Sequence, residues 1–220
     1  IVIYIGDKKM EQNTTNHRLH QTAYHEAGHA VISWYWRRSF EKLTIIPDGE
    51  ILGLVKGSIW SSDLPQCSTH DLEINIDILL AGEAAEEKHC GANRPGMGWI
   101  EDYKKAAEIA KKWAMQTNQP REYMEDIELF ISDSNAELCM YSCDFYFEFG
   151  RNVERLMDRP HIWSSIEALA EKIIKYRELS GDKAHTIIYE QWNKVRGDRE
   201  EKKHEKEDLK IGWGYYKKGK

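Results

Sequence analysis

Long apolar runs are absent from this 220-residue sequence. Its longest apolar stretches, residues 1–5, 30–36 and 76–81, fall well short of the about 18 residues that a membrane-spanning helix needs. The N-terminal residues also lack the succession of basic, apolar and small residues that marks an export signal. We therefore expect no membrane segment in this chain and a cytoplasmic location.

Basic charge and paired cysteines are scarce as well. The 31 Lys and Arg residues are outnumbered by 37 Asp and Glu residues, and the resulting net charge of -6 argues against general nucleic-acid binding. No pair among Cys67, Cys90, Cys139 and Cys143 has the two-residue spacing of a zinc knuckle or redox motif, so we interpret them as reduced and mostly structural. Cys139 and Cys143 could share a helix face, but without nearby histidines a structural role is favoured over a metal role. The phosphate-binding pattern G-x-x-x-x-G-K-[ST] is also missing, and we expect no ATP hydrolysis by these residues.

The composition that remains is that of a soluble globular protein, with 41% hydrophobic residues, 31% charged residues and a mean hydropathy of -0.68. A chain of this length is able to bury one good core, and one catalytic domain is the simplest arrangement. We predict an N-terminal extension over residues 1–18, a folded domain over 19–196 and a charge-dense tail over 197–220 that buries too little apolar surface to order itself. Met10 is the first methionine, and whether the residues before it are native stays open.

Helical periodicity dominates the folded part. Helices are predicted over residues 19–38, 71–89 and 101–113, and helical patterns continue beyond Pro120. The only strand pattern lies at residues 41–47 and 51–55, on either side of a turn at 47–49, and predicts a β-hairpin. One apolar stripe predicts the core of a C-terminal helical bundle: Ile162, Ile166, Leu169 and Ile173. The expected fold class is mainly α, with a small β part (α+β).

Residues 25–29 read His-Glu-Ala-Gly-His, an H-E-x-x-H motif inside the first predicted helix. His25 and His29 project from one helix face, so both imidazoles can reach one zinc ion. Glu26 then lies beside the metal, where it can act as general base on the attacking water. A lone histidine would be interpreted as a core or surface residue, but two at this spacing favour one zinc ion per chain. Gly28 costs about 1 kcal/mol in a helix relative to alanine, which indicates close packing there.

A catalytic zinc site needs a third protein ligand and an open fourth position. Six residues are candidates for the third ligand: Asp102, Glu83, Glu86, Glu87, His70 and His89. Periodicity does not choose among them. Asp102 also has a purely structural explanation, because the helix dipole favours an acid in the first turn of a helix.

Several segments resemble the peptidase module of the FtsH family of AAA proteases. The resemblance begins at residues 22–31, which contain the H-E-x-x-H motif, and spans most of residues 22–192. Its further segments are residues 42–47, 52–55, 80–87, 102–106, 166–170 and 178–181, together with Gly98. The resemblance implies a helical metallopeptidase domain with a small β-hairpin or sheet and a C-terminal helical bundle.

The resemblance also implies roles for individual residues. By the family pattern, the third zinc ligand is the aspartate that opens the helix after the Gly-rich loop, which falls on Asp102. Glu86 corresponds to a carboxylate near the metal histidines, which supports a ligand rather than binding the metal. We assign the strand segment Leu52, Gly53 and Leu54 to substrate binding, with polypeptide added as an extra strand. The implied activity is that of a zinc-dependent metalloendopeptidase that hydrolyses peptide bonds of unfolded or flexible proteins.

The sequence departs from the family pattern in three places. Glu83 stands where the family usually has arginine, and Gly96-Met97-Gly98 stands where it usually has Ser-Thr-Gly. Because family members thread substrate with an ATPase ring, the missing phosphate loop implies either that such a ring lies upstream of these residues or that this is a stand-alone peptidase module, and a separate AAA ATPase partner stays open. We favour a stand-alone peptidase module, and a homo-oligomer stays open.

A non-catalytic, zinc-containing adaptor or regulatory protein is the competing hypothesis. Glu26 speaks against it, because a structural site has no use for a base beside an open metal position.

Overall fold

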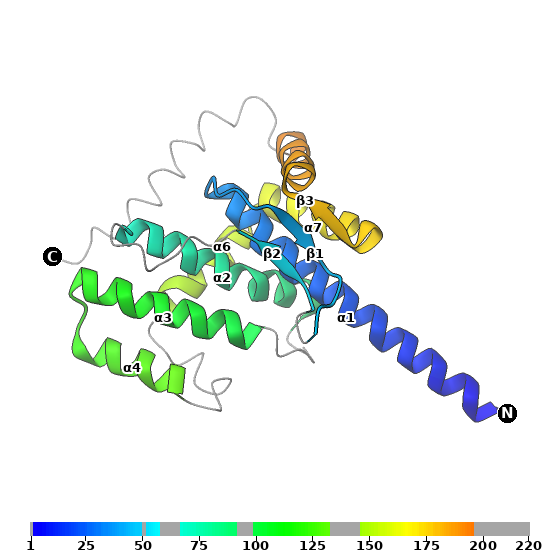
Figure 1. Cartoon of the computed structure of the whole chain (residues 1–220), viewed down its shortest axis with the longest axis horizontal. Coiled ribbons are helices and arrows are strands. Elements are labelled where there is room, and N and C mark those ends of the chain that lie inside the picture. The colour runs from blue at the N-terminus through cyan, green and yellow to red at the C-terminus, as the bar shows by residue number, and fades with distance from the viewer. Residues whose placement is uncertain (1, 50–51, 58–66, 92–98, 133–145, 196–220) are drawn as a thin grey trace.

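The computed structural model describes residues 2–49, 52–57, 67–91, 99–132 and 146–195. These residues form a mainly helical molecule with one small antiparallel sheet (Figure 1). The predicted fold class is therefore confirmed. The predictions made for the loop at residues 96–98, for Cys139 and Cys143, and for the tail over 197–220 lie outside the described residues.

Two helices that pack against each other form the centre of the molecule. They are α1, Val2–Tyr35, and α2, Thr69–Cys90. α1 extends N-terminally beyond the helix predicted from residue 19, and the domain boundary placed there stays a prediction. α2 begins with a capping box, in which Ser68 and Asp71 each accept a hydrogen bond from the other's backbone N–H. An added Cβ at Gly28 would collide with the carbonyl oxygen of Ala81 in α2, which confirms the close packing expected at this glycine.

The sheet consists of β1, Lys42–Thr44, β2, Leu54–Lys56, and β3, Glu178–Ser180, in the order β2-β1-β3. Leu43 pairs with Val55 on one side and with Leu179 on the other, and all three side chains are buried. The predicted β-hairpin is confirmed, although its strands are shorter than expected. β3 was not predicted, because three residues after a helix are too few to show an alternating pattern.

The remaining helices surround α1 and α2. α3, Trp99–Thr117, lies along α2, and α4, Arg121–Ser132, lies against α3 (Figure 1). The π-helical turn η2, Tyr146–Gly150, and α6, Arg151–Met157, also contact α2, whereas α7, Pro160–Tyr176, packs on α1. A last helix covers residues 181–195. The four residues of the predicted apolar stripe lie in α7 and are fully buried, as expected for core residues.

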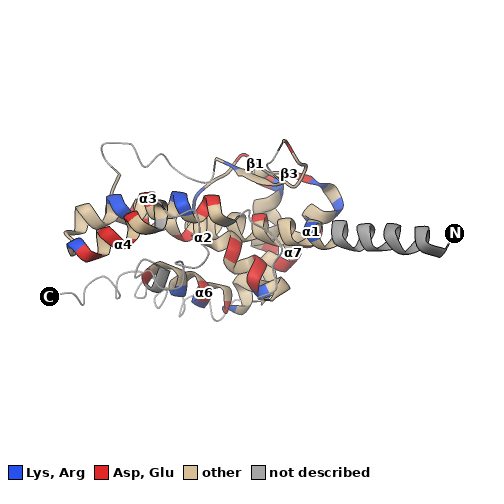
Figure 2. Cartoon of the chain, turned by 90° about the horizontal axis from the view of Figure 1, so that it is seen from below, with Lys and Arg blue, Asp and Glu red and all other residues tan. Residues whose placement is uncertain are grey.

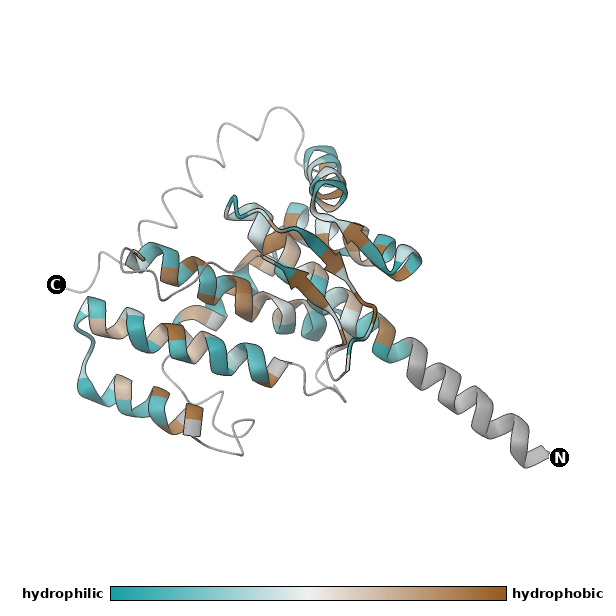
Figure 3. Ribbon diagram, in the orientation of Figure 1, coloured by the Kyte–Doolittle hydropathy of each residue, from teal (hydrophilic) through white to brown (hydrophobic). Residues whose placement is uncertain are grey.

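The distribution of charged and apolar residues can be compared with this arrangement of helices and strands. Acidic and basic residues are distributed along the helices (Figure 2), and apolar residues are frequent on the strands and on α2 (Figure 3). α2 is buried on more than one face, as its sequence predicted. Among the residues that the structure describes, no helix is both long and apolar enough to cross a membrane.

Candidate metal centre

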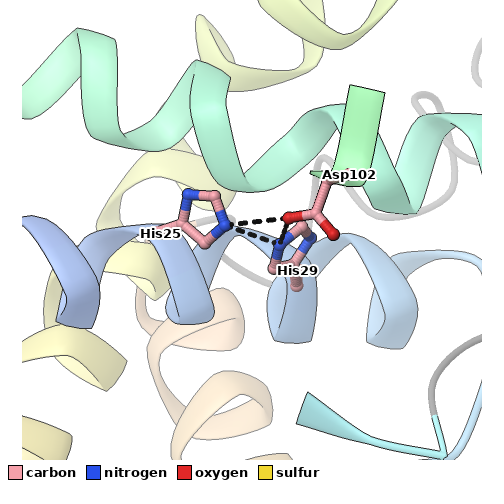
Figure 4. A group of neighbouring side chains, drawn as sticks. All are labelled: His25, His29 and Asp102. Atoms are coloured by element: carbon pink, nitrogen blue, oxygen red, sulfur yellow. Dashed lines mark hydrogen bonds and ion pairs between the residues drawn. The ribbon is translucent and has the colours of Figure 1, made fainter. Parts of the chain in front are cut away.

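The H-E-x-x-H motif lies in the buried half of α1. His25, Glu26 and His29 are all at least nine-tenths buried. The helical spacing places both imidazoles on the face of α1 that meets α2, and their Nε2 atoms lie 3.0 Å apart (Figure 4). The predicted pairing of the two histidines at one point is therefore present in the structure.

α2 orients both imidazole rings. Nδ1 of His29 lies 2.6 Å from the backbone carbonyl oxygen of Ile78, and Nδ1 of His25 lies 3.3 Å from Oε2 of Glu86. Because a carbonyl oxygen only accepts hydrogen bonds, Nδ1 of His29 must carry the proton, which leaves the lone pair of neutral His29 on Nε2. Glu86 thus lies where it can support a ligand, as the family resemblance implied, while the carbonyl of Ile78 had no signal in the sequence.

Gly82 lets α2 approach the two rings. A Cβ added at this position would collide with Nε2 of His29 and would stand 2.7 Å from Nε2 of His25. A larger residue would therefore occupy the space in front of the two nitrogen atoms. The position of a glycine inside a helix was the only sequence signal for this contact.

Asp102 completes the group from the first turn of α3. Its Oδ2 atom lies 3.1 Å from Nε2 of His25 and 3.2 Å from Nε2 of His29 (Figure 4). Among the described residues, these three form the one group of at least three histidine, cysteine or acidic side chains whose ligand atoms all lie within 4.8 Å of one another. Tetrahedral zinc with bonds of about 2.0–2.1 Å needs ligand atoms roughly 3.3 Å apart. The spacing and the donor set therefore fit zinc.

The charges at the centre favour a cation there. Burial lowers the pKa of His25, but hydrogen bonds with Asp102 and Glu86 outweigh it and raise the pKa to about 10. Burial likewise raises the pKa of Asp102, but hydrogen bonds with His25 and His29 hold it well below its ordinary value. The raised pKa of His25 indicates that positive charge is stabilised here, and the lowered pKa of Asp102 indicates that its carboxylate stays ionised and is able to bind a cation.

Glu26 lies between α1 and the segment that leads into β2. A Cβ added at Gly53 would stand 2.6 Å from Cγ and 2.7 Å from Oε1 of Glu26, so Gly53 leaves room for the carboxylate. Burial raises the pKa of Glu26, against the attraction of His25 and His29 and a backbone hydrogen bond from Val55, which lower it. The neighbouring side chains of Leu52 and Leu54 are 52% and 42% exposed. The three residues assigned to substrate binding thus lie beside Glu26.

The other candidates for a third ligand lie elsewhere. The ring of His89 stacks on Tyr24 with centroids 3.5 Å apart, and His70 lies 3.5 Å from Glu73. Glu83 is buried and accepts a hydrogen bond from the hydroxyl of Tyr103. Glu87 lines a cavity of about 420 Å³ between α2, α3 and α6. Sequence reasoning left these four open, and in the structure none of them belongs to the group formed by His25, His29 and Asp102.

Comparisons with known proteins agree with this geometry. A family model described as peptidase family M41 matches residues 12–159, which include all the residues of the centre. The ATP-dependent zinc metalloprotease FtsH of Rickettsia prowazekii (strain Madrid E) is 28% identical over 182 residues, covering 76% of this chain and 28% of the relative. The ATP-dependent zinc metalloprotease YME1L of Drosophila melanogaster is 30% identical over 185 residues, covering 77% of this chain and 24% of the relative. This chain therefore spans about a quarter of the length of these curated relatives. Its matched region exceeds half of the sequence, and the chain belongs to peptidase family M41.

Proposed function

We propose that this chain is a zinc-dependent metalloendopeptidase that hydrolyses peptide bonds in unfolded or flexible polypeptides. One observation carries the proposal: two imidazole nitrogens and one carboxylate oxygen from two helices lie 3.0–3.2 Å from one another, beside the buried carboxyl group of Glu26. The family membership supports the same activity.

Three residues would hold one zinc ion per chain: His25 and His29 through Nε2, and Asp102 through Oδ2. When bound, zinc supplies Lewis-acid chemistry, polarising the scissile carbonyl and making water acidic enough to lose a proton near neutral pH. Glu86 and the carbonyl of Ile78 fix the two rings, so that the histidines present Nε2 to the metal.

Glu26 would move the proton. Its carboxylate takes a proton from the attacking water and later gives it to the nitrogen of the leaving amine. Gly53 and the backbone N–H of Val55 confine this carboxylate on the side of β2, so that it faces the reacting groups and not bulk solvent.

Substrate would bind along β2. Within the described residues, β2 pairs with β1 on one side only, which leaves its other edge able to accept an extended polypeptide. Leu52, Gly53 and Leu54 would form that edge next to Glu26. Binding through backbone hydrogen bonds gives affinity without a required sequence, and it demands a substrate segment that is unfolded.

The partners follow from the relatives. Both relatives are named ATP-dependent, whereas the 220 residues contain no phosphate-binding loop. We therefore propose that any ATP dependence comes from an AAA ATPase in another segment or another chain. We also propose that the peptidase domain and this ATPase act together in a homo-oligomer.

The test compares metal content with cleavage of an unfolded protein substrate by the purified chain. We expect zinc to copurify and a chelator to abolish cleavage. Glu26→Gln should keep zinc and lose cleavage, because the amide cannot take the proton. Asp102→Asn should weaken zinc binding itself, because the amide is a poorer ligand than the carboxylate.

Cleavage retained in Glu26→Gln would refute the assigned mechanism. A wild-type chain that holds zinc but cleaves nothing, with or without an added AAA ATPase, would instead favour the non-catalytic adaptor.

A further inference from the structure

Two hydrogen bonds between an aromatic residue and a glutamate join α3 to α2. The hydroxyl of Tyr103 donates to Glu83, and the indole Nε1 of Trp113 donates to Oε1 of Glu73 over 2.9 Å. Both aromatic rings are almost fully buried. Because the later residue of α3 meets the earlier residue of α2, the two helices run antiparallel and are tied near both ends.

The hydrogen bond between Tyr103 and Glu83 joins two residues that are next in sequence to the metal centre. Glu83 follows Gly82, whose backbone lies against both imidazoles, and Tyr103 follows Asp102, the carboxylate opposite them. One hydrogen bond therefore joins the residue next to Gly82, on the side of the imidazoles, to the residue next to Asp102. The tie between Trp113 and Glu73 lies farther along both helices and touches none of these residues.

Between Tyr103 and Trp113, the buried residues of α3 are three alanines and one isoleucine: Ala106, Ala107, Ala110 and Ile109. These apolar side chains pack closely, but their contacts have no preferred direction. The hydrogen bond of Tyr103 has such a direction, and its acceptor is a buried carboxyl group for which losing a donor is costly.

We propose that Tyr103 and Glu83 are positioning residues that hold Asp102 within reach of His25 and His29. The inference rests on the proposed zinc site. Tyr103 supplies the donor of the hydrogen bond and Glu83 supplies the acceptor.

Zinc affinity of the full chain, measured by competition with a chromophoric chelator, tests the pair. Tyr103→Phe removes only the hydroxyl, and we expect the affinity for zinc to fall about 10-fold or more, the usual effect of losing a group that supports a ligand. Glu83→Gln keeps an acceptor for the Tyr103 hydroxyl, so its zinc affinity should stay near that of the wild type. Glu83→Met has no such acceptor, so its zinc affinity should fall as in Tyr103→Phe. If Tyr103→Phe does not fold, the two Glu83 variants still test the hydrogen bond, because they change its acceptor in α2.

Trp113→Phe is the matched control, because it breaks the tie at the far end of α3. It should lower the thermal unfolding midpoint and leave zinc affinity unchanged. Wild-type zinc affinity in Tyr103→Phe and Glu83→Met, with unfolding midpoints lowered as in the control, would overturn the inference. A wild-type chain without zinc affinity would overturn the proposed function and this inference with it. The zinc affinity of the wild type therefore distinguishes failure of the proposed function from failure of the inference alone.

Discussion

At the scale of single residues, the centre concentrates polar groups that are expensive to bury alone. His25, Glu26, His29 and Glu86 are all at least nine-tenths buried, and each has a polar or charged neighbour in the group. With Nδ1 of His29 committed to a carbonyl, the Nε2 lone pair faces a second imidazole nitrogen at 3.0 Å. A proton on Nε2 of His25 can bridge the two nitrogens, and a zinc ion that replaces this proton would bind both of them.

The space for that cation depends on Gly82. We expect Gly82→Ala to reduce zinc affinity strongly, because the added methyl group would displace both imidazoles. The fold should tolerate the change, since alanine is favoured over glycine inside a helix by about 1 kcal/mol. Zinc content and thermal unfolding of the same preparation check the two halves of this prediction.

Gly53→Ala is the variant to compare with Gly82→Ala, because Gly53 lies against Glu26. Its methyl group would meet the carboxylate of Glu26 and not the imidazoles. Zinc should therefore be retained while kcat falls, because the carboxylate that moves the proton is displaced. If both glycine variants lose zinc to the same extent, the separation of metal binding from proton transfer is wrong.

At the scale of elements, the centre is an assembly of three helices and one strand. α1 supplies both imidazoles and Glu26, α2 orients the rings, α3 brings Asp102, and β2 closes the side of Glu26 (Figure 1). In the proposed function, the edge of β2 would determine how a substrate lies. A chain added to a strand bonds through alternate residues only, because successive N–H groups point to opposite sides.

Peptide substrates with single N-methylated residues test this arrangement. We expect KM to rise when the methyl group blocks an N–H that faces β2 and to stay unchanged when the next residue along the peptide is methylated. The alternation distinguishes strand addition from a general steric effect. Equal cleavage of all the methylated peptides, or of peptides with proline flanking the scissile bond, would contradict binding along β2.

The parts of this assembly that the sequence predicted are those that depend on local spacing. His25, Glu26 and His29 fall within five residues of one helix, and the stripe of α7 repeats at helical spacing. Asp102 is 77 residues from His25 in the chain, so spacing left six candidates and only the family resemblance selected it. The contact of Tyr103 with Glu83 and the pairing of β3 with β1 depend on how helices and strands pack, which no local pattern records.

At the scale of the whole molecule, two acids in α2 make the free energy of unfolding depend on pH in opposite directions. Burial, together with repulsion from Glu73, raises the pKa of Asp77 to about 8, despite the lowering effect of Trp36. Hydrogen bonds with Ser68 and Arg38 lower the pKa of Asp71, against a smaller effect of burial. Asp77 therefore favours the folded state in its protonated form, and Asp71 favours it in its ionised form.

These signs predict how unfolding depends on pH. The contribution of Asp77 is complete below its ordinary pKa of 3.8 and is lost as the pH rises to about 8, so Asp77→Asn should gain stability over the wild type with rising pH. Between about pH 5 and about pH 8, the gain in the free energy of unfolding should reach about 2 kcal/mol or more, measured by urea titration.

Asp71→Asn should be less stable than the wild type at both of these pH values. The contribution of Asp71 is present above its ordinary pKa of 3.8 and is lost only as the pH falls through its lower folded value. A constant difference between Asp77→Asn and the wild type across this range would show that the Asp77 carboxyl group is ionised in the folded chain. Burial would then have to be compensated by a partner, because an unpaired buried carboxylate costs several kcal/mol and would oppose the folding of α2 against its neighbours.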